Sequence, residues 1–291
     1  MKKRLMAAVL STAMAATMLL TGSISVQAAD AAAANDPAVE LIFTSVSVSG
    51  DSHTEAMYEF ADKVEELSGG SVTCKCYDNG SLFSSENEFD ALLNGDADLA
   101  YISFPTIATQ IPSYSMFASG YLFSSYEHMT SVLNGDIGLN KIRPQIEETL
   151  NIKPLSSFYL GSRVINTREK EINSYDDMNG LLLRMPNSEA WLFLGEALGA
   201  NPTPLSFSEL YTALQTGAVD AQDNPLPSIE SAKFYEVTKY IAITNHVVDS
   251  IMPCINGDTW NSMTEAQQEA VTEAMAVSYT HLRAHETGAY L

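Results

Sequence analysis

Two stretches of the same kind decide the fold: LLNGDAD at residues 92–98 and LQTGAVD at residues 214–220. Each contains the apolar end of an expected helix, a glycine that ends it, and the entry into a strand that carries an aspartate. They lie 122 residues apart, from 92 to 214. Two similar α/β halves in one chain predict two lobes with a cleft between them, although the helix–glycine–strand unit is common enough for the similarity to be a coincidence.

The segments around these stretches alternate between strand and helix patterns. Strands are expected at 39–46, 72–76, 97–102, 181–183 and 219–221 from their β-branched or continuous apolar residues. A helix is expected at 52–67. Three more helices are expected to begin at the capping box Ser85-x-x-Glu88, at the N-cap Asn187 and at the second capping box Ser206-x-x-Glu209. Strands that alternate with helices predict an α/β protein with a parallel sheet covered on both faces.

The composition is that of a folded, strongly acidic protein. The 291 residues include 36 Asp and Glu against 15 Lys and Arg, a formal charge of −21, with 46% hydrophobic residues. Nucleic acid and anionic membrane surfaces would repel such a chain. Of its three cysteines, Cys74 and Cys76 share one face of a strand and are expected to be buried; they form neither a disulfide framework nor a zinc set. No metal and no cofactor is expected.

The two ends of the chain have sequence features that differ from those of the folded part. Residues 1–28 have a basic start, an apolar run at 5–20 and the small-x-small motif Val26-Gln27-Ala28, which predicts a signal peptide and an extracytoplasmic protein; a membrane anchor is the less favoured alternative. Residues 29–37 are expected to be a flexible leader. Residues 278–291 interrupt the preceding helical pattern and resemble a translated sequencing adapter, so a non-native tail and a missing true C-terminus are expected. His281 and His285 are not expected to bind metal.

Two arginines stand at the expected ends of strands. Arg184 follows the apolar strand 181–183, and Asn187 begins a helix whose free N–H groups favour an anion. Arg163 follows the apparent strand end in Tyr159–Arg163. A guanidinium gives a carboxylate two parallel hydrogen bonds, so both are candidates for holding an acid. The alternative is that each is an exposed arginine paired with one of the many acids.

Long ordered motifs in the second half resemble the solute-binding receptors of TRAP transporters, the DctP type. They are GSR at 161–163, GLLLRMPN at 180–187, GANPTPLSFSELY at 199–211, ALQTGAVDAQDNP at 213–225, KFYEV at 233–237 and TNH at 244–246. A looser similarity extends through the rest of the mature chain to about Ala276. The resemblance implies a two-lobed periplasmic-binding-protein fold with hinge strands and a ligand cleft. Lobe I is expected at 38–160, lobe II at 161–248, and a return to lobe I at 249–277.

The resemblance also implies a function and a site. It implies a monomeric receptor that captures a small organic acid and delivers it to TRAP membrane subunits. By resemblance Arg184, Arg163 and Asn224 contact the ligand carboxylate, while Asn187 and Phe207 line the pocket in members that bind sialic acid. Those members carry a glutamate and an arginine where this chain has SFPT at 103–106, so a smaller or less polar acid is expected.

Two other functions are compatible with parts of the sequence. A receptor that presents its ligand to a membrane sensor would have the same sequence features. A hydrolase of the Gly-Asp-Ser type is suggested by residues 50–53, Gly-Asp-Ser-His. That chemistry needs a histidine base oriented by an acid, and His246 with Asp249 three residues later has the wrong order. A turn with a helix N-cap is therefore the preferred interpretation of 50–53, and no enzyme is expected.

Overall fold

The computed structural model describes residues 35–288; the expected signal peptide (1–28) and residues 29–34 lie outside this range. Within it, nine strands form one sheet in the order β2-β1-β3-β9-β5-β8-β6-β7, with β4 paired to β9. The strands are β1 (Val39–Thr44), β2 (Val72–Tyr77), β3 (Leu99–Ser103), β4 (Ile152–Pro154), β5 (Phe158–Thr167), β6 (Leu182–Met185), β7 (Asn201–Pro204), β8 (Ala221–Pro225) and β9 (Tyr240–Asn256). The helices are α2 (Ser52–Leu67), α3 (Glu88–Asn94), α4 (Phe104–Ile107), α5 (Tyr126–Leu133), α6 (Arg143–Leu150), α7 (Glu189–Ala197), α8 (Phe207–Thr216), α9 (Leu226–Ser231), α10 (Gly257–Ser262) and α11 (Glu265–Gly288).

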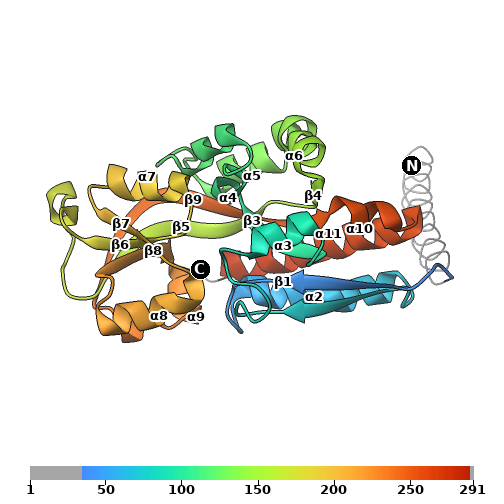
Figure 1. Ribbon diagram of the computed structural model, residues 1–291, viewed down its shortest axis with the longest axis horizontal. Coiled ribbons are helices and arrows are strands. Elements are labelled where there is room, and N and C mark those ends of the chain that lie inside the picture. The colour runs from blue at the N-terminus through green and yellow to red at the C-terminus, as the bar shows by residue number, and fades with distance from the viewer. Residues whose placement is uncertain (1–34, 289–291) are drawn as a thin grey trace, which may run out of the picture.

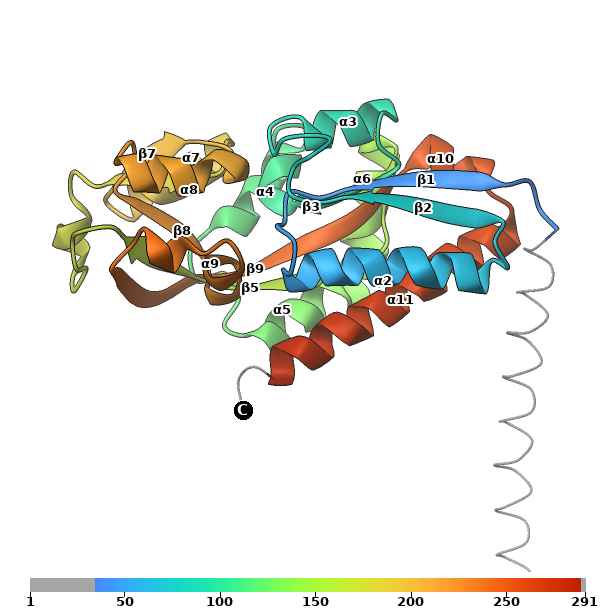
Figure 2. The same ribbon diagram turned by 90° about the horizontal axis from the view of Figure 1, so that it is seen from below.

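The molecule is elongated and has two lobes (Figures 1 and 2). In lobe I, α2 and α11 lie side by side against one face of the sheet, where Phe43, Phe60 and Leu99 are fully buried. The other face packs Phe104 and Met129. Lobe II repeats this arrangement around β6, β7 and β8, with one apolar cluster on each face of its sheet. Along residues 35–288, no helix is both long and apolar enough to cross a membrane.

Two long strands join the lobes. Strand β9 spans 17 residues, pairs with β3 and β4 through its C-terminal half, and pairs with β5 over most of its length. These pairings are antiparallel, as is β5 with β8, whereas β1–β2, β1–β3, β6–β7 and β6–β8 are parallel. The prediction of a parallel sheet is therefore wrong for the centre of the sheet, where β9 and β5 pair antiparallel with their neighbours. The helix–strand alternation belongs to each lobe, while the hinge strands run through both without a crossover helix between them. The lobe boundaries at 160 and 248 remain a prediction.

The two glycines expected to end helices are confirmed in that role, whereas the expected helix caps differ from those in the structure. Gly95 and Gly217 end α3 and α8 in the left-handed region, with φ of 78° and 80°. Neither expected capping box forms: α3 begins at Glu88 itself, and Ser206 caps α8 without a side-chain bond to the backbone. Ser188, not Asn187, is the N-cap of α7, because its hydroxyl accepts from the Trp191 N–H.

Cys74 and Cys76 lie on one face of β2 and pack against the core of lobe I, as the strand pattern predicts. They are free thiols and are only partly buried, so the expectation of full burial is wrong. Strand β2 lies at the edge of the sheet, where β1 is its one neighbour among the described strands. An edge strand has a neighbour on one side alone, so its side chains are less covered than those of an inner strand.

The C-terminal helix does not break where the sequence suggested. Helix α11 continues through residue 278 to Gly288. The Ser278 hydroxyl donates to the Ala56 carbonyl oxygen at 2.7 Å, Tyr279 stacks on Phe158 and Leu282 is buried. Residues 271, 275, 278 and 282 lie on one face of the helix by their spacing, so the buried face of α11 continues past residue 278. The non-native origin of 278–291 stays a prediction.

Candidate functional site

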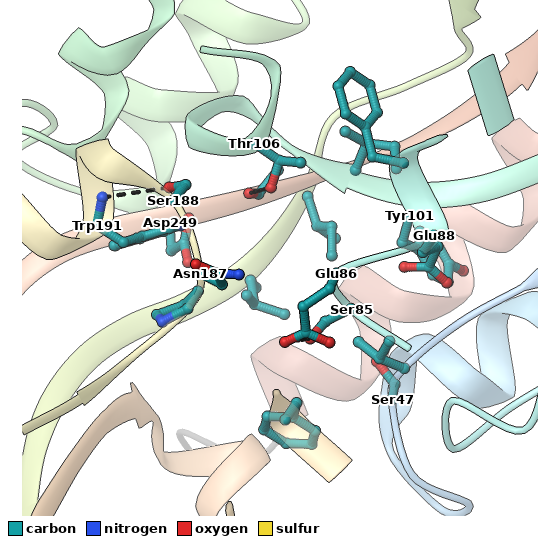
Figure 3. Close-up of a pocket in the computed structure, with 18 of the residues that line it drawn as sticks. Ser47, Ser85, Glu86, Glu88, Tyr101, Thr106, Asn187, Ser188, Trp191 and Asp249 are labelled. Carbon is teal, nitrogen blue, oxygen red and sulfur yellow. Dashed lines mark hydrogen bonds between the residues drawn. The ribbon is translucent and has the colours of Figure 1, made fainter. Parts of the chain in front are cut away.

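A cavity of about 380 Å³ lies between the lobes (Figure 3). Lobe II contributes residues at the ends of β6, β8 and α7, and lobe I contributes α3, β3 and the loop before α2. All five residues that the sequence analysis selected line it: Arg163, Arg184, Asn187, Phe207 and Asn224. The fold therefore brings these residues, which lie up to 61 positions apart in the sequence, to one place. That they contact a ligand remains a prediction.

Arg184 is a buried cation whose guanidinium bonds to a backbone carbonyl oxygen and not to an acid within the described residues. It lies inside β6, not after it as expected, because the strand extends from Leu182 to Met185. Its side chain is 2% exposed, and Nε donates to the Leu205 carbonyl oxygen at 2.8 Å. Among residues 35–288 it forms no ion pair with a carboxylate. Burial lowers the pKa of Arg184 to about 10, opposed by the field of Asp223 and reinforced by Arg163. A guanidinium so placed at a cavity wall favours an anion.

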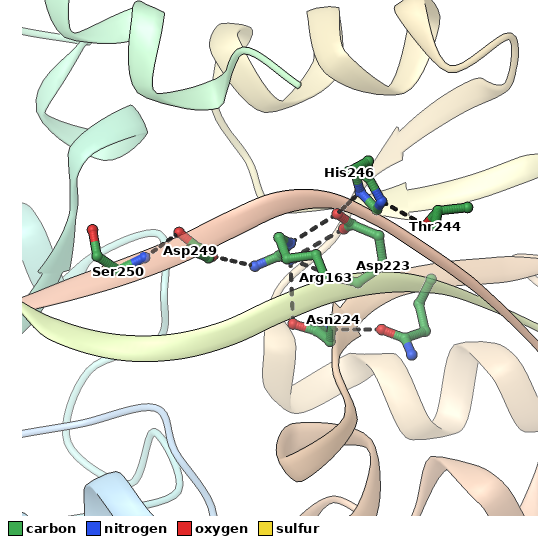
Figure 4. A network of polar contacts seen from close by, with 8 residues as sticks. Arg163, Asp223, Asn224, Thr244, His246, Asp249 and Ser250 are labelled. Carbon is green, nitrogen blue, oxygen red and sulfur yellow. Dashed lines mark hydrogen bonds and ion pairs between the residues drawn. The ribbon is translucent and has the colours of Figure 1, made fainter. Parts of the chain in front are cut away.

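Arg163 is buried too, but its charge is matched (Figure 4). It lies in the middle of β5, not at a strand end as expected, because β5 continues to Thr167. Nε donates to Asp223 Oδ2 at 2.8 Å, Nη2 to Asp223 Oδ1 at 3.1 Å, and Nη1 to Asp249 Oδ2 at 2.7 Å. The guanidinium also lies over the Trp191 ring, 4.5 Å from its centroid. Nη2 also donates to the Asp223 carbonyl oxygen at 2.7 Å. The four hydrogen bonds occupy all but one of the five N–H groups, so Arg163 can offer a ligand at most a single donor.

The two aspartates beside Arg163 differ in their electrostatic state. Burial alone would raise the pKa of Asp223, but Arg163 and His246 hold it below its ordinary value. His246 Nε2 lies 3.2 Å from Asp223 Oδ2, the same oxygen that accepts from Arg163 Nε. Asp249 has the one guanidinium contact, and burial leaves its pKa above the ordinary value. Asp223 is thus firmly ionised and fixes Arg163 in place.

The remaining predicted residues shape the lobe II wall. The Asn224 amide donates to Gln222 Oε1 at 2.6 Å, while its Oδ1 accepts from Arg163 Nη2 at 3.3 Å. Phe207, the first residue of α8, packs edge-on against Phe234. Asn187 stands at the turn before α7 and points towards the cavity in Figure 3. The wall therefore combines one apolar ring with fixed amide groups.

Sequence reasoning missed the acidic wall that lobe I supplies. Asp51, Glu86, Glu88 and Asp90 all line the cavity, together with the hydroxyls of Ser47, Ser85, Ser103 and Thr106. The Ser85-x-x-Glu88 spacing predicts a capping box and gives no indication that Glu88 is buried in the cavity wall. The stretch 103–106 adds only hydroxyls, whose oxygens lie 2.9 Å apart. Its lack of charge had favoured a smaller or less polar acid, yet α3 provides polar groups in its place.

The motif at residues 50–53 has a structural role. Asp51 is the N-cap of α2 and accepts from the His53 N–H at 2.9 Å. His53 Nδ1 lies 3.2 Å from Asp51 Oδ1, and His53 Nε2 lies 3.1 Å from the Tyr159 carbonyl oxygen. His246, the histidine base that a hydrolase would need, bonds instead to Asp223 and Thr244. Residues 50–53 therefore form the turn and N-cap that the sequence favoured.

Comparison with known proteins identifies the family. A model described as bacterial extracellular solute-binding protein, family 7 (DctP), matches residues 43–286. The chain belongs to this family. The sialic acid-binding periplasmic protein SiaP of Vibrio cholerae is 34% identical over 215 residues, which cover 74% of this chain and 66% of that protein. The alignment thus spans just under two thirds of that relative's length.

Solved structures of family 7 receptors share the fold. A TRAP periplasmic solute-binding protein from Roseobacter denitrificans, with bound 3-deoxy-D-manno-oct-2-ulosonic acid, is 38% identical with a TM-score of 0.81, covering 86% of this chain and 82% of that one. A TRAP periplasmic solute-binding protein from Sulfurospirillum deleyianum, with bound succinate, is 26% identical with a TM-score of 0.80, covering 86% and 80%. The chain therefore has the mixed α/β fold of the TRAP periplasmic solute-binding proteins, and its family is one of solute-binding proteins and not of enzymes.

Proposed function

We propose that this receptor captures a small organic acid in the interlobe cavity through Arg184. The observation that carries the proposal is a buried guanidinium at the cavity wall with no carboxylate partner among residues 35–288. Taking a cation out of water costs several kcal/mol unless an opposite charge compensates it. Asp223 and Asp249 compensate Arg163, which leaves Arg184 as the cation that a ligand carboxylate would neutralise.

The ligands of related proteins support an acid. The names of relatives specify sialic acid, 2,3-diketo-L-gulonate and C4-dicarboxylates, and solved structures hold galactonate and succinate. These compounds share a carboxylate and little else. Receptors that bind such different ligands would use one common site for the carboxylate. A guanidinium suits this site, because it recognises a carboxylate through two parallel hydrogen bonds.

Closure of the cleft would complete the site. The carboxylate docks on Arg184 of lobe II, where the single spare N–H of Arg163, the amide of Asn187 and the ring of Phe207 are within the same wall. Lobe I then covers the ligand. Asp51 of lobe I already accepts a hydrogen bond from the Ser231 hydroxyl of α9 at 3.0 Å, across the cleft. The closed state is favoured by as much as the ligand binds it better than the open state.

We further propose that the receptor acts outside the cytoplasm as a monomer and delivers its ligand to TRAP membrane subunits. The family match and the TRAP receptors among its structural relatives support this. Presentation of the ligand to a membrane sensor is the second candidate, since the same closed surface would serve it.

The test is binding of an acid panel to the mature protein and to Arg184→Lys. A ligand at 100 times its dissociation constant stabilises the folded state by about 2.7 kcal/mol, which a thermal-shift screen detects. Lysine keeps the charge but loses the paired donors, so we expect affinity measured by calorimetry to fall by roughly tenfold to a hundredfold. Arg143→Lys is the matched control, because Arg143 bonds to Leu155 and Asn134 in lobe I and does not line the cavity. Equal affinity in Arg184→Lys and wild type would refute the proposal.

A further inference from the structure

One acid of the lobe I wall points into the cavity with open acceptor atoms. Glu86 lies in the turn before α3, is exposed and lines the cavity. Figure 3 shows its side chain pointing into the cavity, towards the space between Ser47 of lobe I and Asn187 of lobe II. Within residues 35–288 this side chain accepts one hydrogen bond, from the Ser85 hydroxyl to Oε1 at 3.3 Å. A carboxylate has about four lone-pair sites, so Glu86 can accept further donors.

Two other acids of this wall are less able to serve a ligand. Both carboxylate oxygens of Asp51 already accept hydrogen bonds within the protein. Glu88 is buried, and burial raises its pKa well above the ordinary value. An exposed carboxylate such as that of Glu86 is ionised at neutral pH. Glu86 therefore brings both a negative charge and free acceptor sites to the cavity.

The charge of Glu86 limits which acids can dock on Arg184. Both residues line the cavity, and the field of Glu86 reaches Arg184, where it opposes the effect of burial on the pKa. A ligand carboxylate held by Arg184 therefore enters the field of Glu86, and the two negative charges repel each other. A ligand hydroxyl close to that carboxylate offsets the repulsion by donating to Glu86, and a hydrogen bond to an ionised acceptor is a strong one. An acid without this hydroxyl leaves Glu86 facing a carboxylate when closure removes water.

We propose that Glu86 determines specificity by accepting a hydrogen bond from a ligand hydroxyl next to the carboxylate that Arg184 holds, so that the receptor selects 2-hydroxy acids over the matching acids without that hydroxyl. This inference rests on the proposed function, because it takes the carboxylate to be held by Arg184. It names the class of acid within that function and assigns the selection to one residue of lobe I.

The test uses pairs of acids that differ in that hydroxyl alone. The pairs are D-gluconate and 2-deoxy-D-gluconate, malate and succinate, and lactate and propionate. Both enantiomers of malate and of lactate are measured, and the tighter one is compared with its partner. For each pair that wild type binds, we expect calorimetry to show the 2-hydroxy acid bound roughly tenfold more tightly, or better.

Two substitutions separate the hydrogen bond from the charge. Glu86→Gln keeps an acceptor oxygen and removes the repulsion, so the acids without the hydroxyl should bind more tightly and the preference should narrow by about threefold. Glu86→Ala also removes the acceptor, so the 2-hydroxy acid should weaken about tenfold and the preference should vanish. The exposed side chain makes both variants foldable, with melting temperatures within about 2 °C of wild type. Asp96→Asn is the matched control, because it removes one charge from an exposed position just after α3 and should leave every affinity unchanged.

Several outcomes would overturn the inference. They are equal binding within the pairs by wild type, an unchanged preference in Glu86→Ala, and an equal narrowing in Asp96→Asn or in Asp90→Asn. Tighter binding of aspartate than of malate, or of alanine than of lactate, would also overturn it, because the donor would then be an ammonium group. Equal binding within the pairs that is weakened in Arg184→Lys would refute the role of Glu86 and leave the proposed function standing. Failure of every acid to bind would refute both.

Discussion

Replacing the two cavity arginines by methionine should affect the stability of the ligand-free protein differently: Arg163→Met should lower it and Arg184→Met should not. Arg163 compensates two buried aspartates, so Arg163→Met leaves Asp223 and Asp249 without their counter-ion. Breaking a buried pair by removing one partner costs about 3–5 kcal/mol. At roughly 2–4 °C per kcal/mol for a chain of this size, the melting temperature should fall by about 6–20 °C.

Arg184→Met removes a buried charge that forms no ion pair with a carboxylate of residues 35–288. The loss is one hydrogen bond, from Nε to the Leu205 carbonyl oxygen, worth about 1 kcal/mol. The gain is relief of the desolvation cost, and apolar replacement of buried charges is often neutral or stabilising by about 1–4 kcal/mol. We therefore expect the melting temperature of the ligand-free variant to stay level or rise by a few degrees, while acid binding is lost.

Both variants can be measured by differential scanning calorimetry on ligand-free protein, with binding followed by titration calorimetry. The reasoning depends on the difference in charge matching between the two sites, not on the size of the arginine. If Arg184→Met lowers the ligand-free melting temperature as much as Arg163→Met does, Arg184 has a stabilising partner that this reasoning omits, and the argument for a missing counter-ion fails.

Three further outcomes follow from the fold. Asp223→Asn should destabilise the protein by about 3–5 kcal/mol at pH 7, whereas Glu169→Gln, at an exposed ion pair with Lys239, should leave the stability nearly unchanged. The pKa of Asp223 is lowered by folding, so its contribution is present above about pH 4 and disappears as the pH falls further; melting curves of wild type and variant should converge there. Ser231→Ala removes the cross-lobe hydrogen bond and should weaken ligand binding about fivefold in calorimetry. Gly161→Ala should destabilise the hinge by more than about 1 kcal/mol in urea titration, because its φ is +128° and a Cβ would lie 2.4 Å from Pro225 Cβ.

The sequence identifies the candidate binding arginines but not their electrostatic state. Arg184 and Arg163 both appear in motifs of the family, and both line the cavity. The partners of Arg163 lie 60 and 86 residues away, and the pairing of β5 with β8 and β9 brings them together. Composition and spacing carry no information on that register. For this reason two arginines that look alike in sequence differ in the structure, one paired and one not.

Glu88 shows the opposite failure, in which a correct local pattern leads to a wrong assignment. Ser85-x-x-Glu88 satisfies the spacing of a capping box, and a helix does follow. The helix begins two residues later than a cap at Ser85 would place it, because Phe89 and Leu92 bury their side chains in the lobe I core, and the neighbouring Glu88 is buried as well. Tertiary packing outweighed a capping preference worth about 1 kcal/mol.

The arrangement of charges explains how an acidic protein can hold an anion. Two guanidiniums in one wall repel each other, and Arg163 does lower the pKa of Arg184. Asp223 reduces that repulsion, because its carboxylate binds Arg163 in two places and its field also reaches Arg184. Lobe II therefore keeps one positive charge outside any ion pair, fixed by the Leu205 carbonyl oxygen, while the charged residues that lobe I adds to the cavity lining are all acids among the described residues. A ligand carboxylate is complementary to the lobe II wall, and closure of lobe I over the ligand would exclude water from the pair that the carboxylate forms with Arg184.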